Sequence, residues 1–224
     1  MIFTLTATGD SLLTRALPKE KGADFAAVAA MVQESDISFT NLEFTVPKEP
    51  WIAAPKANGI NMTMHIGSES QVLDDLRDFG FNLFSGANNH SVDYNYLGLV
   101  DTVEQLKVRG MICAGIGNDL DEAQEPKYLM IDGLRVAIIG AASSFTYGAY
   151  ASRSRNGRSG RPGINPLRFS TTYQLDEKRM QMLREIDEAL GTAALTEESM
   201  EIGLLKDIGK YRFLGSYFTQ DEKC

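Results

Sequence analysis

The chain has 224 residues, of which 43% are hydrophobic, so it is long and apolar enough to bury a core. Its 22 basic and 30 acidic residues give a net charge of −8, which argues against a general nucleic-acid-binding protein, because such proteins present a basic surface. No apolar run approaches the roughly 18 residues of a membrane span, and the first residues lack the pattern of a signal peptide.

The two cysteines, Cys113 and Cys224, offer neither a disulfide framework nor a metal-binding spacing. Together with the absence of a signal-peptide pattern, this predicts a reducing, cytoplasmic setting.

The first part of the chain predicts strands that alternate with helices. Residues 2–8 alternate and are rich in β-branched side chains, which indicates a strand, and the alanine-rich residues 24–33 predict a helix. Residues 44–67 contain three prolines and read as an irregular excursion. Two further helices are expected over 68–79 and 96–109, since each has apolar positions at helical spacing and a glycine at its end.

The later part predicts an antiparallel element and two more helices. Residues 127–140 form two apolar runs around Asp132-Gly133, which favours a β-hairpin with a type I′ turn. Helices are expected over 173–190 and from Thr196 to 208. An antiparallel hairpin after strand–helix repeats indicates a mixed sheet rather than a purely parallel one.

Polar side chains follow three of the strand-like runs. The first run leads to Asp10, the run 37–40 leads to Asn41 and Glu43, and the run 81–84 leads to Asn89 and His90. If these strands are parallel neighbours, the five side chains converge at the edge where ligands bind in α/β sheets. Hard oxygen donors with one nitrogen suit Mn, Mg, Fe or Zn. Each residue taken singly is also a common turn or cap residue, and that alternative stays open.

Several motifs resemble the bacterial capsule-synthesis family of CapA type. They are Gly9-Asp10, Asn41-Leu42-Glu43, the stretch from Ala87 to Asp93, the turn 115–118 and the segment 161–167. The resemblance covers about residues 4 to 170. It implies a link to poly-γ-glutamate capsules and an α/β, metallophosphoesterase-like (calcineurin-like) fold, with mixed sheet layers flanked by helices. We expect one such domain over 1–224, incomplete at its C-terminal end. Family members are often membrane-anchored or exported.

The resemblance also assigns roles to the polar residues. It implies that Asp10, Glu43 and Asn89 hold a divalent metal ion and that His90 contacts the substrate phosphoryl group or acts as a general acid. Asn41 and Asp93 would orient these groups. The family's later histidine motifs are missing, and Leu12 stands where many metallophosphoesterases have a histidine. Three interpretations remain: the chain is the N-terminal portion of a longer protein, it binds one metal weakly, or it is not a catalyst.

Residues 141–171 show no predicted element and carry a concentration of positive charge, with arginines at 153, 155, 158 and 161. One interpretation is a flexible lid in which Arg153, Arg155, Arg158 and Arg161 gather an anionic group, a phosphate or a polyglutamate carboxylate. The other is a solvated loop.

Two functions are therefore expected. The first is a metal-dependent, phosphoesterase-like hydrolase in capsule or polyglutamate metabolism. The alternative is a non-catalytic accessory module that uses the same pocket to hold an anionic small molecule or polymer.

Overall fold

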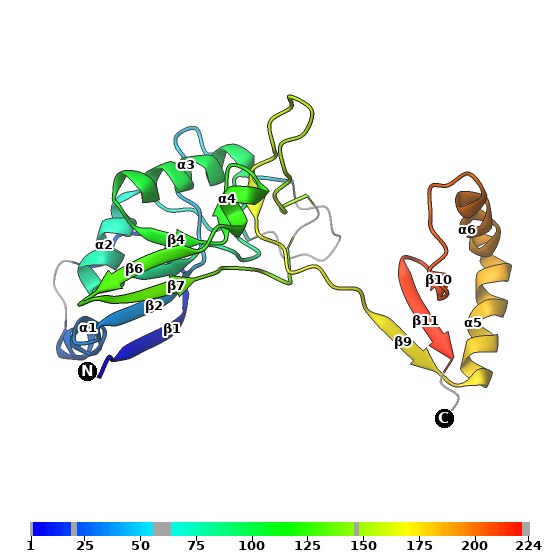
Figure 1. Ribbon diagram of the computed structural model, residues 1–224, viewed down its shortest axis with the longest axis horizontal. Helices are drawn as coiled ribbons and strands as arrows, with labels where there is room; N and C mark the ends of the chain where they lie inside the picture. The colour runs from blue at the N-terminus through cyan, green and yellow to red at the C-terminus, as the bar shows by residue number, and fades with distance from the viewer. Residues whose placement is uncertain (1, 19–21, 56–63, 146–147, 221–224) are drawn as a thin grey trace. The chain divides into compact units, whose positions relative to one another are not determined.

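The computed structural model describes residues 2–18, 22–55, 64–145 and 148–220. The chain divides into two compact units, Met1–Leu167 and Arg168–Cys224 (Figure 1). One domain was expected over residues 1–224, and the boundary between the two units was not predicted. We refer to them as unit 1 and unit 2.

The centre of unit 1 is a four-stranded parallel sheet. Its strands are hydrogen-bonded in chain order: β1 (Leu5–Ser11), β2 (Ile37–Leu42), β3 (Leu83–Ser85) and β4 (Ile112–Ala114). The first strand runs three residues past its predicted end, so that Asp10 lies within β1 and pairs in register with Asn41. Because neighbouring strands are parallel, their carboxyl ends meet at one edge, as the convergence argument requires.

Four helices flank this sheet: α1 (Ala23–Gln33), α2 (Gln71–Phe79), α3 (Asn95–Val108) and α4 (Leu120–Gln124). Apolar side chains of α1, α2 and α3 form one core with the strands, in which Leu73 of α2, Leu99 of α3 and Phe84 of β3 are almost fully buried. The predicted helices are thus confirmed, although α2 begins three residues later than expected. No helix in the described part of the chain is long and apolar enough to cross a membrane.

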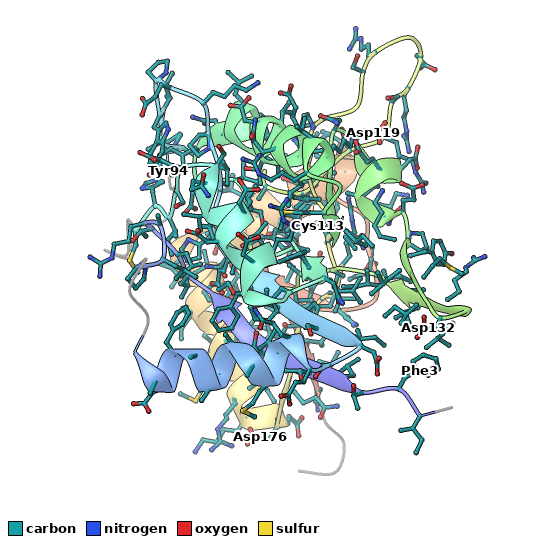
Figure 2. The ribbon with its side chains drawn as sticks, turned by 90° about the vertical axis from the view of Figure 1, so that its left-hand side faces the viewer. Phe3, Tyr94, Cys113, Asp119, Asp132 and Asp176 are labelled. Atoms are coloured by element: carbon teal, nitrogen blue, oxygen red, sulfur yellow. The ribbon has the colours of Figure 1, made fainter. Side chains whose placement is uncertain are left out.

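The predicted β-hairpin is also confirmed. It consists of β6 (Lys127–Ile131) and β7 (Leu134–Ile138), and Asp132 and Gly133 both have positive φ, as a type I′ turn requires. Figure 2 shows Asp132 at the outer tip of this hairpin and Cys113 in the interior of the unit.

The segment 141–171 contains more regular structure than the sequence indicated. Its strand β8 (Gly163–Ile164) pairs antiparallel with β5 (Ile116–Gly117), and Ile164 is fully buried. The expectation of a segment without elements was therefore wrong at this point. The mobility expected for the arginine-rich part stays a prediction.

Unit 2 is a small sheet with two helices. It contains β9 (Thr172–Leu175), α5 (Glu177–Leu190), α6 (Thr192–Glu201), β10 (Tyr211–Phe213) and β11 (Ser216–Gln220), with strand order β10-β11-β9. The helix predicted from residue 173 starts later, because residues 172–175 pair with β11 and Asp176 caps the helix. The second predicted helix was placed too late, since Thr196 lies inside α6.

Candidate functional site

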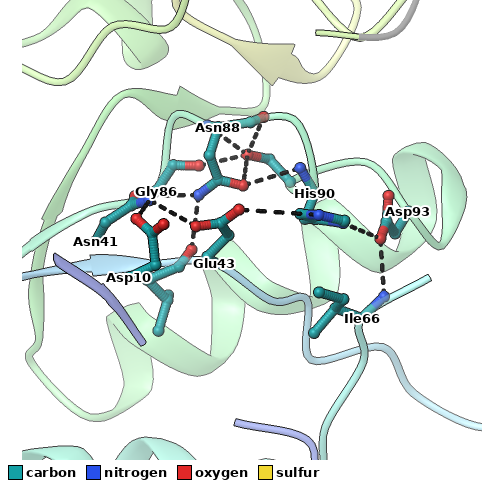
Figure 3. Close-up of polar contacts among 10 residues, drawn as sticks. Asp10, Asn41, Glu43, Ile66, Gly86, Asn88, His90 and Asp93 are labelled. Carbon is teal, nitrogen blue, oxygen red and sulfur yellow. Dashed lines mark hydrogen bonds and ion pairs between the residues drawn. The ribbon is translucent and has the colours of Figure 1, made fainter. Parts of the chain in front are cut away.

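The carboxylates of Asp10 and Glu43 are held by one amide group. The Nδ2 of Asn41 donates to Asp10 Oδ1 at 2.8 Å and to Glu43 Oε2 at 3.3 Å (Figure 3). Asn41 can do this because it pairs with Asp10 across β1 and β2, while Glu43 follows two residues later on the same side of the chain. The structure therefore brings together two of the three predicted metal ligands and the residue expected to orient them.

The two carboxyl groups differ in their environments. Burial, followed by the hydrogen-bonding interaction and negative charge of Asp10, raises the pKa of Glu43 above its ordinary value. The hydrogen bond from Asn41, followed by the interaction with Glu43, lowers the pKa of Asp10. The two environments therefore shift the pKa values of Asp10 and Glu43 in opposite directions.

The turn after β3 is tied to this pair by Asn88. The Nδ2 of Asn88 donates to the carbonyl of Leu42 at 2.9 Å and to Asn41 Oδ1 at 3.2 Å, and its Oδ1 accepts from the His90 backbone N–H at 3.0 Å (Figure 3). Asn88 is buried, whereas Asn89 is exposed. Sequence reasoning chose Asn89 and missed Asn88. The two amides are adjacent, and only the path of the turn decides which one points inward.

His90 is positioned by a buried carboxylate. Its Nδ1 donates to Asp93 Oδ2 at 2.7 Å, and the same oxygen accepts the Ile66 backbone N–H at 2.8 Å. Asp93 is only 1% exposed. Because a carboxylate accepts hydrogen bonds, Nδ1 carries the hydrogen, and the other ring nitrogen faces away from Asp93. That nitrogen, Nε2, lies 3.8 Å from Glu43 Oε1. The predicted pair of His90 and Asp93 thus meets the carboxylate pair.

Residues 51–54, in the first part of the irregular excursion, contact the turn that carries His90. The backbone N–H of Ala54 donates to the carbonyl of Asp93 at 2.7 Å, and Asn95 Nδ2 donates to the carbonyl of Ile52 at 2.8 Å. Trp51 packs edge-on against the ring of Tyr94, with ring centroids 5.5 Å apart. These contacts hold the turn that carries His90 and Asp93 against residues 51–54. A sequence pattern gives no sign of them, because they join residues about 40 positions apart.

The four predicted anion-binding arginines fall into two pairs. Arg153 Nε donates to Asp121 Oδ1 at 2.7 Å, and Arg161 donates to the carbonyl of Tyr150. Arg155 and Arg158 are exposed at the end of a hairpin. The four arginines therefore differ in their surroundings: Arg153 and Arg161 bond to neighbouring residues of unit 1, and Arg155 and Arg158 lie exposed at the hairpin tip.

A divalent metal ion fits part of this site. Asp10 and Glu43 share one amide donor, and the charge of Asp10 raises the pKa of Glu43. A cation bound between two such carboxylates would relieve the repulsion of their negative charges. Among the described residues, however, no three His, Cys, Asp or Glu side chains form a group able to hold a metal ion. A cation bound by Asp10 and Glu43 would complete its coordination with amide or water oxygens.

The fold and the family match define the class of the protein. A mixed α/β architecture, with a parallel sheet flanked by helices, is consistent with a metallophosphoesterase-like fold. Residues 4–203 match the family model described as bacterial capsule synthesis protein PGA_cap, and the chain belongs to this family. The family resemblance seen in the motifs is thereby confirmed.

Three curated relatives illustrate the similarity. The chain is 29% identical over 216 residues to the uncharacterized protein y4uA of Sinorhizobium fredii, and the aligned region covers 92% of this chain and 46% of the relative. It is 27% identical over 159 residues to the capsule biosynthesis protein CapA of Bacillus anthracis, covering 69% and 38%. It is 24% identical over 171 residues to the PGA biosynthesis protein CapA of Bacillus subtilis, covering 74% and 42%. The chain thus spans less than half the length of these relatives.

Proposed function

We propose that this chain acts in capsule or poly-γ-glutamate biosynthesis and that unit 1 carries a metal-dependent, phosphoesterase-like hydrolytic site. Membership of the capsule-synthesis family supports the first part, as do the names of the two CapA relatives, a capsule biosynthesis protein and a PGA biosynthesis protein. The cluster at the carboxyl edge of the sheet supports the second.

The observation that carries the hydrolytic proposal is the position of His90, whose ring is hydrogen-bonded to Asp93 on one side and lies 3.8 Å from Glu43 on the other. A buried carboxylate holds one nitrogen of the imidazole, so the ring presents its other nitrogen to the carboxylate pair in a fixed orientation. An imidazole held in this way is suited to give or take a proton at Nε2 during hydrolysis. His90 therefore exchanges the proton with the substrate, and Asp93 sets the tautomer and stabilises the charged ring.

Asp10 and Glu43 are the residues that would hold a divalent cation, with Asn41 positioning both carboxylates. Such an ion, when bound, supplies Lewis-acid stabilisation of charge on a phosphoryl oxygen and lowers the pKa of a bound water. The substrate class is an anionic small molecule or polymer, a phosphoester or polyglutamate, and the arginine hairpin provides positive charge for it.

Turnover of an aryl phosphoester with added Mn²⁺ tests this function. We expect His90→Asn to lower kcat by roughly 10²–10⁴-fold, which is the usual contribution of a general acid or base. Asp93→Asn should lower it by roughly 10–100-fold, as for other residues that orient a catalytic group. Glu69→Gln is the control, because Glu69 is an exposed residue of unit 1 that is not part of the cluster. Equal activity in the wild type and His90→Asn would reject the proposal.

A non-catalytic accessory module is the second candidate. It is favoured by the finding that, in the part of the chain that the structure describes, no three acidic, histidine or cysteine side chains gather as a metal site. An anionic polymer that binds the wild-type protein without any metal-dependent turnover would identify this function. Turnover that is lost on chelation and in His90→Asn would exclude it.

A further inference from the structure

The arginine-rich segment ends in a tight two-residue hairpin. The backbone N–H of Arg155 donates to the carbonyl of Arg158 at 3.1 Å, and the N–H of Arg158 donates back to the carbonyl of Arg155 at 2.9 Å. Between them, Asn156 and Gly157 have φ of 52° and 75°, the left-handed conformations of a type I′ turn. In such a pair the two side chains stand opposite each other on the same face. The turn thus places the side chains of Arg155 and Arg158 on one face of the hairpin.

The base of the hairpin is anchored to unit 1. Backbone bonds join Ser152 N to the carbonyl of Arg161 at 3.0 Å and Leu120 N to the carbonyl of Ser152 at 3.2 Å. Arg153 binds Asp121 on α4, and the Arg161 guanidinium stacks on the Tyr150 ring, 4.6 Å from its centroid. Arg153 and Arg161 are therefore occupied in holding the hairpin in place.

The tip has no counter-charge of its own. Within the described ranges of the chain, no acidic side chain lies within ion-pair distance of Arg155 or Arg158, although the whole chain carries a net charge of −8. Like charges directly opposite each other on neighbouring strands destabilise the pairing. The residues 154–159 also line a hollow of about 350 Å³, and its lining contains serine, asparagine, glycine and arginine but no acid. The lining therefore offers positive charge and hydrogen-bond donors to an anion, and its oxygens are uncharged hydroxyl, amide and backbone oxygens.

The hairpin rises from the same edge of the sheet as the His90 cluster. Beside its base, Asn165 N donates to the carbonyl of Gly115, which directly follows β4, at 2.8 Å. Tyr96, in the first turn of α3, donates its hydroxyl to the carbonyl of Gly148 at 2.9 Å. Both anchoring points, like the His90 turn, follow the carboxyl end of a strand in the parallel sheet.

We propose that Arg155 and Arg158 bind one oxyanion group, a carboxylate or a phosphate, and that Arg153 and Arg161 serve to hold the hairpin that presents them. The link to a substrate processed at His90 rests on the proposed function, whereas binding of the anion does not. Two arginine side chains on one face of a hydrogen-bonded turn suit a planar or tetrahedral oxyanion, because each guanidinium group can donate two parallel N–H groups.

Calorimetric titration in chelator, without added metal, tests this site separately from hydrolysis. The probes are poly-L-glutamate, inorganic pyrophosphate and, as the uncharged comparison, a soluble polyglutamine peptide. We expect Arg155→Ala with Arg158→Ala to weaken binding of the anionic probe about tenfold, as loss of one or two charge-assisted contacts would. Arg155→Lys with Arg158→Lys should weaken it less, since the charge remains and the paired donors are lost. The charge-matched control is Lys178→Ala with Lys206→Ala, two exposed residues of unit 2, and it should bind as the wild type does.

The two anionic probes distinguish the source of the oxyanion. Arginine-dependent binding of polyglutamate alone identifies a carboxylate ligand, and arginine-dependent binding of pyrophosphate alone identifies a phosphate ligand. The proposal is overturned if neither anionic probe binds, or if the variant Arg155→Ala with Arg158→Ala binds as tightly as the wild type. It is also overturned if the control Lys178→Ala with Lys206→Ala loses as much affinity as that arginine variant. Because no turnover is measured, an inactive His90 cluster leaves these outcomes unchanged.

Discussion

Neutralising Glu43 should stabilise the metal-free protein at neutral pH. Glu43 and Asp10 both accept from Asn41 Nδ2, which places their oxygens about 6 Å apart or less. Two charges at about 6 Å repel by ~0.7 kcal/mol in water and by ~2.8 kcal/mol at an effective dielectric constant of 20. Because Asp10 is exposed and well screened, we take a value near the lower end. Glu43→Gln should therefore raise the free energy of unfolding by about 1 kcal/mol in chelator at pH 7.

The gain should disappear in acid. Since burial and Asp10 raise the pKa of Glu43, folding favours its protonated form. That contribution is fully present below the pKa of the unfolded chain, near 4.5, and is lost as the pH rises through the raised pKa of the folded state. The wild type should therefore match Glu43→Gln near pH 4 and fall behind it toward pH 7.

Thermal unfolding followed by tryptophan fluorescence measures this difference, because the single tryptophan, Trp51, lies in unit 1. A gain of 1 kcal/mol corresponds to a rise in Tm of about 2–4 °C in a protein of this size. Glu69→Gln, which neutralises an exposed acid in the same unit, should leave Tm within about 1 °C, as surface substitutions usually do. A Glu43→Gln variant that is less stable than the wild type at pH 7, or one whose advantage persists at pH 4, would refute the reasoning.

Three further outcomes are expected. Asp93→Ala should destabilise unit 1 by roughly 2–5 kcal/mol in chemical unfolding, because it leaves the His90 Nδ1–H and a buried backbone amide without their acceptor; a loss below 1 kcal/mol would show that water replaces the carboxylate. Tyr211→Phe should cost about 1–3 kcal/mol in unit 2, since the Tyr211 hydroxyl donates to the buried Asp187 at 2.5 Å, and a spectrophotometric titration should place the pKa of Tyr211 at about 12. Burial raises the pKa of Cys113 to about 12, so in a variant whose other cysteine is serine, a thiol reagent at pH 8 should label the unfolded protein only; rapid labelling of the folded protein would contradict this.

The parts of the structure that depend on local chemistry could be predicted from the sequence. Asp132-Gly133 between two apolar runs specified its hairpin, because both residues tolerate the positive φ of a type I′ turn. The meeting of Asp10 with Glu43 followed from a single assumption, that the strands preceding them are parallel neighbours. A second turn of the same type, Asn156-Gly157, carried the same signal and was missed, since it is flanked by arginine and serine rather than by apolar runs.

Non-local pairing accounts for the remaining errors. Residues 173–175 were placed in a helix, but they pair with β11, about 45 positions later in the chain, and no local pattern reveals such a partner. The buried position of Asn88 was missed for a related reason, and the metal-ligand role expected for Asn89 stays a prediction. The side chain of Asn88 points inward because its Nδ2 donates to the carbonyl of Leu42 on β2. The spacing of residues along the turn does not specify that partner.

Binding of Mn²⁺, measured as the loss of free Mn²⁺ signal in electron paramagnetic resonance, tests the central claim most directly. If Asp10 and Glu43 hold the ion, the wild type binds one Mn²⁺ with a dissociation constant in the millimolar range, because the described residues offer no group of three His, Cys, Asp or Glu side chains that could hold it more tightly. Asp10→Asn with Glu43→Gln should abolish that binding, whereas Glu69→Gln with Asp78→Asn, which removes the same charge elsewhere in unit 1, should preserve it. Equal binding of Mn²⁺ by the wild type and by the Asp10→Asn, Glu43→Gln variant would contradict the account.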